Sequence, residues 1–159
     1  MNTNSIYIRN ANDKDAPLLR KLASLCPPLD IHTHYTYWFM CRFSDDNCFI
    51  AFERETPIGY ITSVDTNQGV FIWQIGLIQE KQGLGYSALL IDKVVNHALS
   101  QNKRMIVTIS RDNENSYQAF KKYCEKHSLS MTPCDELEIT DIDDPDFCEK
   151  EVIYIISTE

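Results

Sequence analysis

The chain has 159 residues, of which 43% are hydrophobic and 24% charged, so we expect one globular domain spanning residues 1–159. Its formal net charge of -8 argues against a nucleic-acid partner, which needs a basic surface, and favours a cationic or amine-bearing small ligand. The chain has neither an apolar run of about 20 residues, as a membrane helix requires, nor a signal-peptide pattern at its start, so we expect no membrane association and a cytoplasmic location.

The first third of the chain predicts a strand and two helices. Residues 5–11 alternate as a strand does, and Asn12 or Asp13 can cap the helix that follows. The apolar positions of this helix are Leu18, Leu19, Leu22 and Leu25. Two prolines, Pro27 and Pro28, end it.

A second short helix is expected within residues 29–43. Its apolar side would consist of Tyr35, Trp38, Phe39, Met40 and Phe43. For Trp38, Phe39 and Met40 we prefer a core position. Asp30 and Tyr35 differ, because an acid and a phenol beside a Pro-Pro break are well placed to line a cleft.

The middle of the chain predicts three strands. Residues 47–54 and 58–65 are of strand type and are joined by Glu55, Thr56 and Pro57, which indicates a hairpin. A turn at residues 67–69 then leads into an apolar strand, residues 70–77.

The second half predicts two helices and two strands. Residues 85–100 form an amphipathic helix with an apolar stripe of Leu89, Leu90, Val94, Val95 and Ala98. Residues 104–110 are almost all apolar, which indicates a central strand, and a helix over residues 114–127 follows. The acidic residues 135–151 are interpreted as a solvated connection, or alternatively as a means to concentrate a cationic substrate, before a last strand at residues 152–157. This order predicts an α/β fold with a mixed sheet in three layers.

A glycine-containing turn, residues 82–87 (QGLGYS), joins the apolar strand to the next helix. A helix N-terminus presents unpaired N–H groups and the positive end of the helix dipole, and glycines let an anion approach the backbone closely. The turn therefore predicts a pyrophosphate site. It lacks the Lys-Ser/Thr pair of a P-loop and the glycine spacing of the dinucleotide fingerprint, which argues against nucleoside triphosphates and NAD.

The six cysteines form no C-x-x-C pair, and we interpret them as buried free thiols. His32 and His34 alternate in a loop without a nearby acidic or cysteine partner, so we expect no metal site.

The chain resembles the GNAT N-acetyltransferases, whose acetyl-CoA loop has the pattern Q/R-x-x-G-x-G/A. Within that superfamily it resembles the L-2,4-diaminobutyrate acetyltransferases of ectoine biosynthesis over about residues 6–127. The resemblance lies in the blocks CPPLDIHTHYTYWFMCRF, DNCFIAFE, FIWQIGL and TISRDNENS, which begin at residues 26, 46, 71 and 108. It implies a three-layer α/β/α fold with a mostly antiparallel sheet splayed at the acetyl-CoA site, an acetyl-CoA cosubstrate and a homodimer.

The resemblance also implies which residues meet the coenzyme. Backbone groups near Ile75, Gly76 and Leu77 would bond the pantetheine arm and polarise the thioester carbonyl. The residues that would hold the pyrophosphate are Gln82, Gly83, Leu84, Gly85, Tyr86 and Ser87. The residues that would line the other side of the coenzyme are Asn113, Ser116 and Phe120.

On the amine side we expect Asp30, Tyr35, Trp73 and Glu151 to line the pocket. Asp30 would hold a substrate ammonium, Trp73 would pack against its methylenes, and Glu151 would act as the base, directly or through water. The alternative for Glu151 is a solvated member of the acidic segment.

Many members of the superfamily carry a tyrosine acid where this chain has Phe120. Another group or water must then protonate the leaving thiolate, and Tyr117, Tyr123 and Cys124 are candidates of equal standing.

Several positions depart from the subfamily pattern. His32 and Thr33 stand where Asn-Ser is usual, Gln82 where Arg is usual, and Cys148 near the place of a histidine. His32, Thr33 and Cys148 are expected on the substrate side. They therefore favour the alternative that another small amine is acetylated. Phe120 favours a third possibility, an acetyl-CoA-binding module without turnover.

Overall fold

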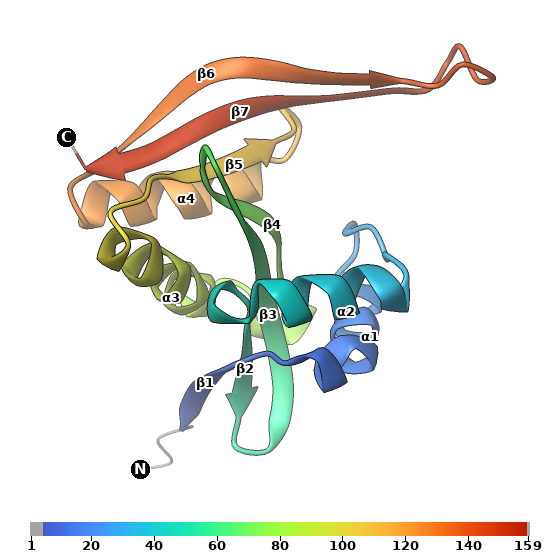
Figure 1. Ribbon diagram of the computed structural model, residues 1–159. Coiled ribbons are helices and arrows are strands. Elements are labelled where there is room, and N and C mark those ends of the chain that lie inside the picture. Colours follow the sequence, from blue (N-terminus) through green and yellow to red (C-terminus); the bar gives the residue numbers. More distant parts are fainter. Residues whose placement is uncertain (1–4, 159) are drawn as a thin grey trace.

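The computed structural model describes residues 5–158. Its strands are β1 Ile6–Asn10, β2 Phe49–Glu53, β3 Thr56–Thr66, β4 Gly69–Leu77, β5 Met105–Ile109, β6 Leu129–Thr140 and β7 Cys148–Thr158. Its helices are α1 Ala16–Ser24, α2 His34–Phe43, α3 Tyr86–Ser100 and α4 Glu114–Lys126 (Figure 1).

The strands form one seven-stranded sheet in the order β1-β2-β3-β4-β5-β7-β6. Among the described strands only the β4·β5 pair is parallel, and every other pairing is antiparallel. The predicted mixed, mostly antiparallel sheet is therefore confirmed, with residues 104–110 supplying a strand in its interior.

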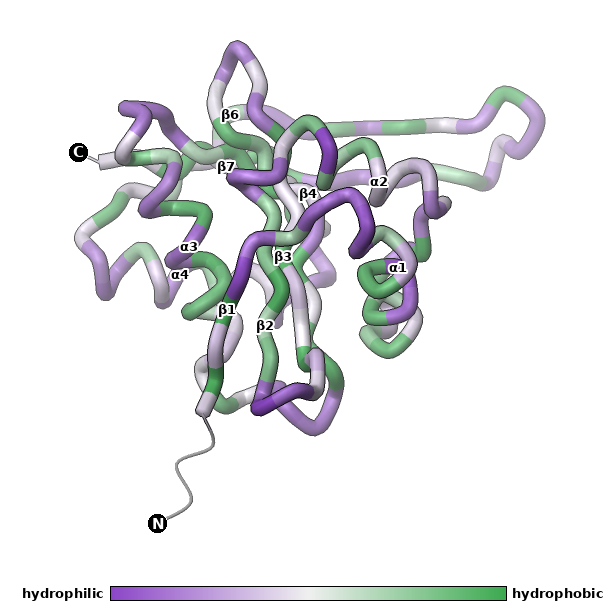
Figure 2. Tube along the Cα trace, turned by 60° about the horizontal axis from the view of Figure 1, so that its bottom comes forward, coloured by the Kyte–Doolittle hydropathy of each residue, from purple (hydrophilic) through white to green (hydrophobic). Residues whose placement is uncertain are grey.

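Two separate apolar cores lie on the two faces of the sheet. One joins the sheet to α3 and α4, and the other joins it to α1 and α2. Figure 1 shows the two helix pairs on either side of the strands, and Figure 2 shows hydrophobic residues concentrated along β2 and β3. The three-layer α/β/α arrangement predicted from the sequence is thus confirmed.

Local chemistry sets where the first two helices begin. The side chain of Asn12 accepts a hydrogen bond from Lys14 N while Asp15 accepts one from Asn12 N, and this capping box starts a 3-10 turn, Asp13–Asp15, that leads directly into α1. Thr33 caps α2 by accepting from Thr36 N. The helix therefore starts at His34, and the residues before it remain an extended loop beside the sheet.

The predicted apolar faces are partly wrong. Leu25 lies beyond the end of α1 and is half exposed. In α2 the buried residues are Tyr37, Met40 and Cys41, whereas Phe39 and Phe43 are exposed. Positions 37, 40 and 41 share one helical face, and this face points to the core. The helix is therefore rotated about its own axis from the predicted orientation.

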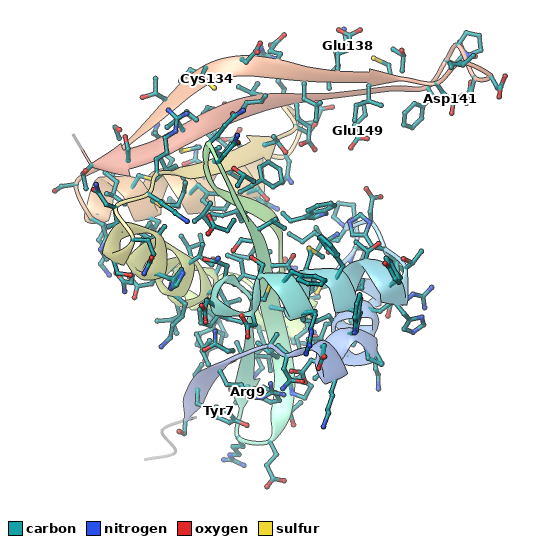
Figure 3. All side chains as sticks on the ribbon, in the orientation of Figure 1. Tyr7, Arg9, Cys134, Glu138, Asp141 and Glu149 are labelled. Atoms are coloured by element: carbon teal, nitrogen blue, oxygen red, sulfur yellow. The ribbon has the colours of Figure 1, made fainter. Side chains whose placement is uncertain are left out.

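The acidic segment, residues 135–151, is not the solvated connection that the sequence suggested. It comprises the end of β6, the turn and the start of β7 in a long hairpin. β6 was not predicted, and β7 begins before residue 152; their register pairs Thr140 with Cys148 near the turn. Figure 3 shows Glu138 and Glu149 along this arm, Asp141 near its tip and Cys134 on β6. The arm leaves the body of the protein, so most of its side chains meet only solvent.

All six cysteines are free thiols, of which four are buried. Cys134 and Cys148 are exposed on the arm, so the expectation of burial is wrong for these two. No helix within residues 5–158 is long and apolar enough to cross a membrane.

Candidate functional site

The sheet opens between its two parallel strands. β4 and β5 pair only at Val70↔Met105, Phe71↔Ile106 and Ile72↔Val107. Within residues 5–158, no residue of β4 after Ile72 pairs with β5. The edge of residues 73–77 that faces β5 therefore has no strand beside it. Backbone N–H and C=O groups on such an edge are available to a ligand, except that Leu77 O already accepts from Gln82 Nε2 at 3.1 Å.

A β-bulge marks the same point on the other side of β4. Ser63 of β3 lies opposite Ile72, and Thr62 lies opposite Gln74, so Trp73 is an extra residue in the ladder. Bulges increase the local twist and re-aim a side chain, and they are frequent beside active sites. Here the bulge coincides with the beginning of the opening.

Gln74 is the centre of a buried hydrogen-bond network. Its Oε1 accepts from Tyr37 Oη at 3.0 Å and from Tyr60 Oη at 2.8 Å, and its Nε2 donates to the carbonyl oxygen of Asp30 at 2.8 Å. Burial raises the pKa of both tyrosines, so their hydroxyls remain protonated donors. The network joins β3, β4, α2 and the loop before α2.

The loop before α2 packs closely on this face of β4. A Cβ added at Gly76 would lie 2.8 Å from Leu29 Cδ1 and 3.2 Å from Cys26 Sγ. The indole Nε1 of Trp73 donates to His32 Nε2 at 3.1 Å. The loop is therefore held against the strand both by close packing at a glycine and by side-chain hydrogen bonds.

The turn of residues 82–87 connects β4 to α3. Gly83 and Gly85 have φ of +76° and +83°, which favour glycine, and a Cβ at either would find no atom within 4 Å. Gly85 is the N-cap of α3 and makes no side-chain cap. The first N–H groups of the helix are therefore free of a side-chain cap, as an anion site requires.

The other predicted coenzyme residues belong to α4. The side chain of Asn113 accepts from Ser116 N at 3.2 Å, so it caps the helix. Phe120 is 1% exposed and packs in the core shared with α3. The ring is covered on all sides in this conformation.

The three candidates for protonating the thiolate differ in their surroundings. Tyr123 Oη donates to Asp92 Oδ1 at 2.7 Å, and burial is the main cause that raises the pKa of Tyr123. Burial raises the pKa of the Cys124 thiol to about 11. Tyr117 is partly buried with its ring centroid 5.8 Å from that of Tyr154.

Glu151 lies on the far side of the opening, on β7. It precedes Val152, which pairs with Ile109 at the end of β5. Its side chain is half-buried and lines a pocket of about 230 Å³. The other residues that line this pocket are Ser110, Arg111, Asp112, Glu136 and Lys150.

The structure brings some of the predicted amine-side residues together and leaves others apart. Asp30 and Trp73 lie close together, because Gln74 hydrogen-bonds Asp30 O and its neighbour Trp73 hydrogen-bonds His32 in the same loop. Tyr35 is 72% exposed, and its ring packs on Trp38 at a centroid distance of 5.4 Å. Glu151 belongs to the opposite wall, and its place as base remains a prediction.

Sequence reasoning missed Gln74 and its two tyrosines. A polar residue within the apolar run FIWQIGL is a signal of a buried hydrogen-bond partner, although it does not identify that partner. No group of three or more His, Cys, Asp or Glu within residues 5–158 is placed to hold a metal ion.

Known proteins resemble this chain in sequence and in fold. Residues 16–125 match the sequence model of the acetyltransferase (GNAT) family. The L-2,4-diaminobutyric acid acetyltransferase of Marinococcus halophilus is 29% identical over 108 residues, which are 65% of this chain and 63% of that protein. The protein of the same name from Shouchella clausii is 30% identical over 103 residues, 62% of this chain and 58% of that protein. The matches thus span about three fifths of the length of these relatives.

Solved structures share the fold over nearly the whole chain. The diaminobutyrate acetyltransferase of Paenibacillus lautus, in complex with L-2,4-diaminobutyric acid and coenzyme A, has a TM-score of 0.83 at 21% identity and covers 96% of this chain and 95% of its own. The Ard1 protein of Thermoplasma volcanium has a TM-score of 0.77 at 15% identity, with 97% and 99% covered. The family match extends over more than half of the residues and includes the glycine turn and the splayed strands, and the chain belongs to the GNAT acetyltransferase family.

Proposed function

We propose that the protein is an acetyl-CoA-dependent N-acetyltransferase that acetylates the side-chain amine of L-2,4-diaminobutyrate or a closely similar diamine-type amino acid. The observation that carries this proposal is the similarity to relatives named L-2,4-diaminobutyric acid acetyltransferase. The family match over residues 16–125, which include β4 and the glycine turn, agrees with it. The open edge of β4 directly before that turn supports it.

The coenzyme side of the proposal uses backbone groups. The left-handed glycines of the turn and the N-terminus of α3 fit a pyrophosphate, since nothing lies where a Cβ at either glycine would point. The free edge near Ile75, Gly76 and Leu77 would bond the pantetheine arm and polarise the thioester carbonyl. Asn113 and Ser116 at the start of α4 would border the coenzyme from the side of β5, whereas Phe120, also expected there, lies buried in the core in the middle of α4.

The amine side uses side chains. An amine attacks a thioester only as its free base, so the site must accept a proton while it holds the amine near the thioester carbon. Asp30 would bind a substrate ammonium and Trp73 would pack on the methylenes, with Tyr35 at the rim. Glu151 would accept the proton from the opposite wall, directly or through water.

A second candidate is acetylation of another small amine. His32 supports it, because its imidazole hydrogen-bonds Trp73 and so forms part of the wall that would meet the acceptor. Thr33 is a further position at which the expected subfamily pattern is not kept. Cys148 was also expected on the substrate side, but it is exposed near the turn of the hairpin arm, so it does not support this candidate.

The test is thiol release from acetyl-CoA over a panel of amines. We expect turnover with L-2,4-diaminobutyrate, and acetylation at the side-chain nitrogen is checked by NMR of the product. Turnover of polyamines or aminoglycosides without turnover of diaminobutyrate would refute the specific form. Coenzyme binding by calorimetry with no turnover of any amine would favour a binding module.

We further propose a single GNAT domain over residues 1–159 that acts as a cytoplasmic homodimer in ectoine biosynthesis. The single sheet supports the domain assignment. The resemblance of the sequence blocks to the diaminobutyrate acetyltransferases supports the dimer and the pathway. Sedimentation equilibrium tests the dimer.

A further inference from the structure

Two consecutive residues of β4 bind one short segment of chain. Gln74 Nε2 donates to Asp30 O at 2.8 Å, and Trp73 Nε1 donates to His32 Nε2 at 3.1 Å. Consecutive side chains of a regular strand point to opposite faces. The bulge at Trp73 interrupts this alternation, so both side chains reach residues 30–32.

The amide of Gln74 has a single orientation. Its side chain is buried, and two tyrosine hydroxyls, Tyr37 Oη and Tyr60 Oη, donate to Oε1. A carbonyl oxygen only accepts, so the NH₂ group must face Asp30 O. Oε1 then accepts from both tyrosine hydroxyls, and these three hydrogen bonds together hold the amide against the backbone of Asp30.

The hydrogen bond of Trp73 requires one particular form of His32. An indole N–H is only a donor, so His32 Nε2 must be an unprotonated acceptor with the ring proton on Nδ1. A proton on Nε2 would face the indole N–H and abolish the bond.

Few charged or titratable groups face the imidazole. From α1, Arg20 Nε donates to His32 O at 3.1 Å; from α2, the Tyr37 ring centroid lies 5.9 Å from that of His32; and Asp30 lies in the same segment. Trp73 on β4 completes the surroundings, edge-on at a centroid distance of 5.7 Å.

We propose that Gln74 and His32 are positioning residues of the amine site, Gln74 fixing Asp30 and His32 fixing the Trp73 ring. This inference rests on the proposed function, which assigns Asp30 and Trp73 to the acceptor amine. It adds that His32 must present an acceptor nitrogen to the indole, so that a side chain without an acceptor at this position weakens binding of the amine.

Steady-state kinetics with diaminobutyrate provide the first test. We expect Gln74→Met and His32→Leu each to raise the KM for the amine about five- to tenfold, as the loss of one hydrogen bond implies, and to leave the KM for acetyl-CoA within about twofold. His32→Gln restores a side-chain acceptor, so it should return the KM for the amine most of the way to the wild-type value. An unchanged amine KM in folded, active Gln74→Met and His32→Leu would overturn the proposal.

A matched variant separates positioning from stability. Tyr60→Phe removes one buried hydrogen bond from the same glutamine but leaves the bond between Gln74 and Asp30 O. We expect a lower Tm with an amine KM close to that of the wild type. If instead the amine KM rises in proportion to lost stability in every variant, the network is only structural.

Fluorescence tests the His32–Trp73 bond without turnover. The chain has two tryptophans, so Trp38→Phe leaves Trp73 as the single reporter. We expect its emission to change when His32→Leu is added to Trp38→Phe, and to be largely restored when His32→Gln is added instead. An unchanged emission with His32→Leu would refute the part assigned to His32. If Trp38→Phe shows this dependence on His32 but the wild-type protein turns over no amine, the proposed function is refuted and the hydrogen bond is retained.

Discussion

Replacement of Gly85 by alanine should weaken coenzyme binding while leaving the fold intact. Gly85 has φ of +83° at the N-cap of α3, and a Cβ there would contact nothing within 4 Å. The whole effect of the methyl group is therefore conformational, and a non-glycine residue costs about 1–2 kcal/mol in this region. Without coenzyme, the turn of the alanine variant can relax into a right-handed conformation. The fraction of molecules with the left-handed turn that binds the coenzyme then falls about 5- to 30-fold, and the Kd for acetyl-CoA rises by the same factor.

Isothermal titration calorimetry with acetyl-CoA measures this factor directly. Gly85→Asn is the matched variant, because asparagine adopts the left-handed region more readily than alanine and should lose less affinity. Gly69→Ala is the control for general damage: Gly69 also has positive φ, and a Cβ there would lie 2.6 Å from Arg104 O, so stability should fall without a change in the Kd. An unchanged Kd in Gly85→Ala would refute the placement of the pyrophosphate at this turn.

Three further predictions concern stability and chemistry. Arg9 hydrogen-bonds the carboxylate of Asp15 and holds its pKa below the ordinary value, so the ion pair stabilises the fold above about pH 4 and is lost as the pH falls through the lowered pKa. Asp15→Asn should lower the free energy of unfolding in urea by about 1–3 kcal/mol at pH 7 and by much less at pH 3, and an equal loss at both would contradict this. Gly76→Ala should lower the free energy of unfolding by about 1–3 kcal/mol, because the added Cβ would lie 2.8 Å from Leu29 Cδ1. An unchanged Tm would show that the loop before α2 moves away without cost. Glu151→Gln should lower kcat about 100-fold or more at saturating amine, and a kcat within threefold of wild type would exclude Glu151 as the base.

The local features of the coenzyme side could be predicted from sequence. An apolar strand, two glycines and a helical stripe follow one another within residues 70–100, and each is recognisable within a short window. Gly83 and Gly85 are both in left-handed conformations, and α3 begins directly after them, as the pattern indicates. The similarity of these residues to a known family added the identity of the ligand, which the local physics alone left as an anion.

β6 could not be predicted because it lacks the signal on which such predictions depend. An ordinary strand alternates between a buried and an exposed face, but β6 is an edge strand, and most of its side chains from residue 132 onward are exposed. Its sequence also contains a proline and several carboxylates, which are depleted in strands. Pairing with β7 determines its structure, and that pairing is not a local property.

The network around Gln74 was missed for a similar reason. Its partners are 14, 37 and 44 positions away in the sequence, on a strand, a helix and a loop. The composition of β4 indicates that a buried polar side chain needs partners, whereas only the packing of α2 against the sheet determines that they are two tyrosines and a backbone carbonyl.

The arrangement of β4 also explains why the acceptor could change while the coenzyme is retained. Its edge toward β5 offers backbone groups, which are present whatever the side chains are, and the turn that follows likewise offers N–H groups. Its face toward α2 offers side chains, which contact the segment of residues 30–32. A substitution at His32 therefore alters the wall that meets the amine and leaves every backbone donor on the edge in place. We accordingly expect the acceptor specificity of this protein to be decided on that face, by the loop before α2, and its use of acetyl-CoA to be decided on the edge.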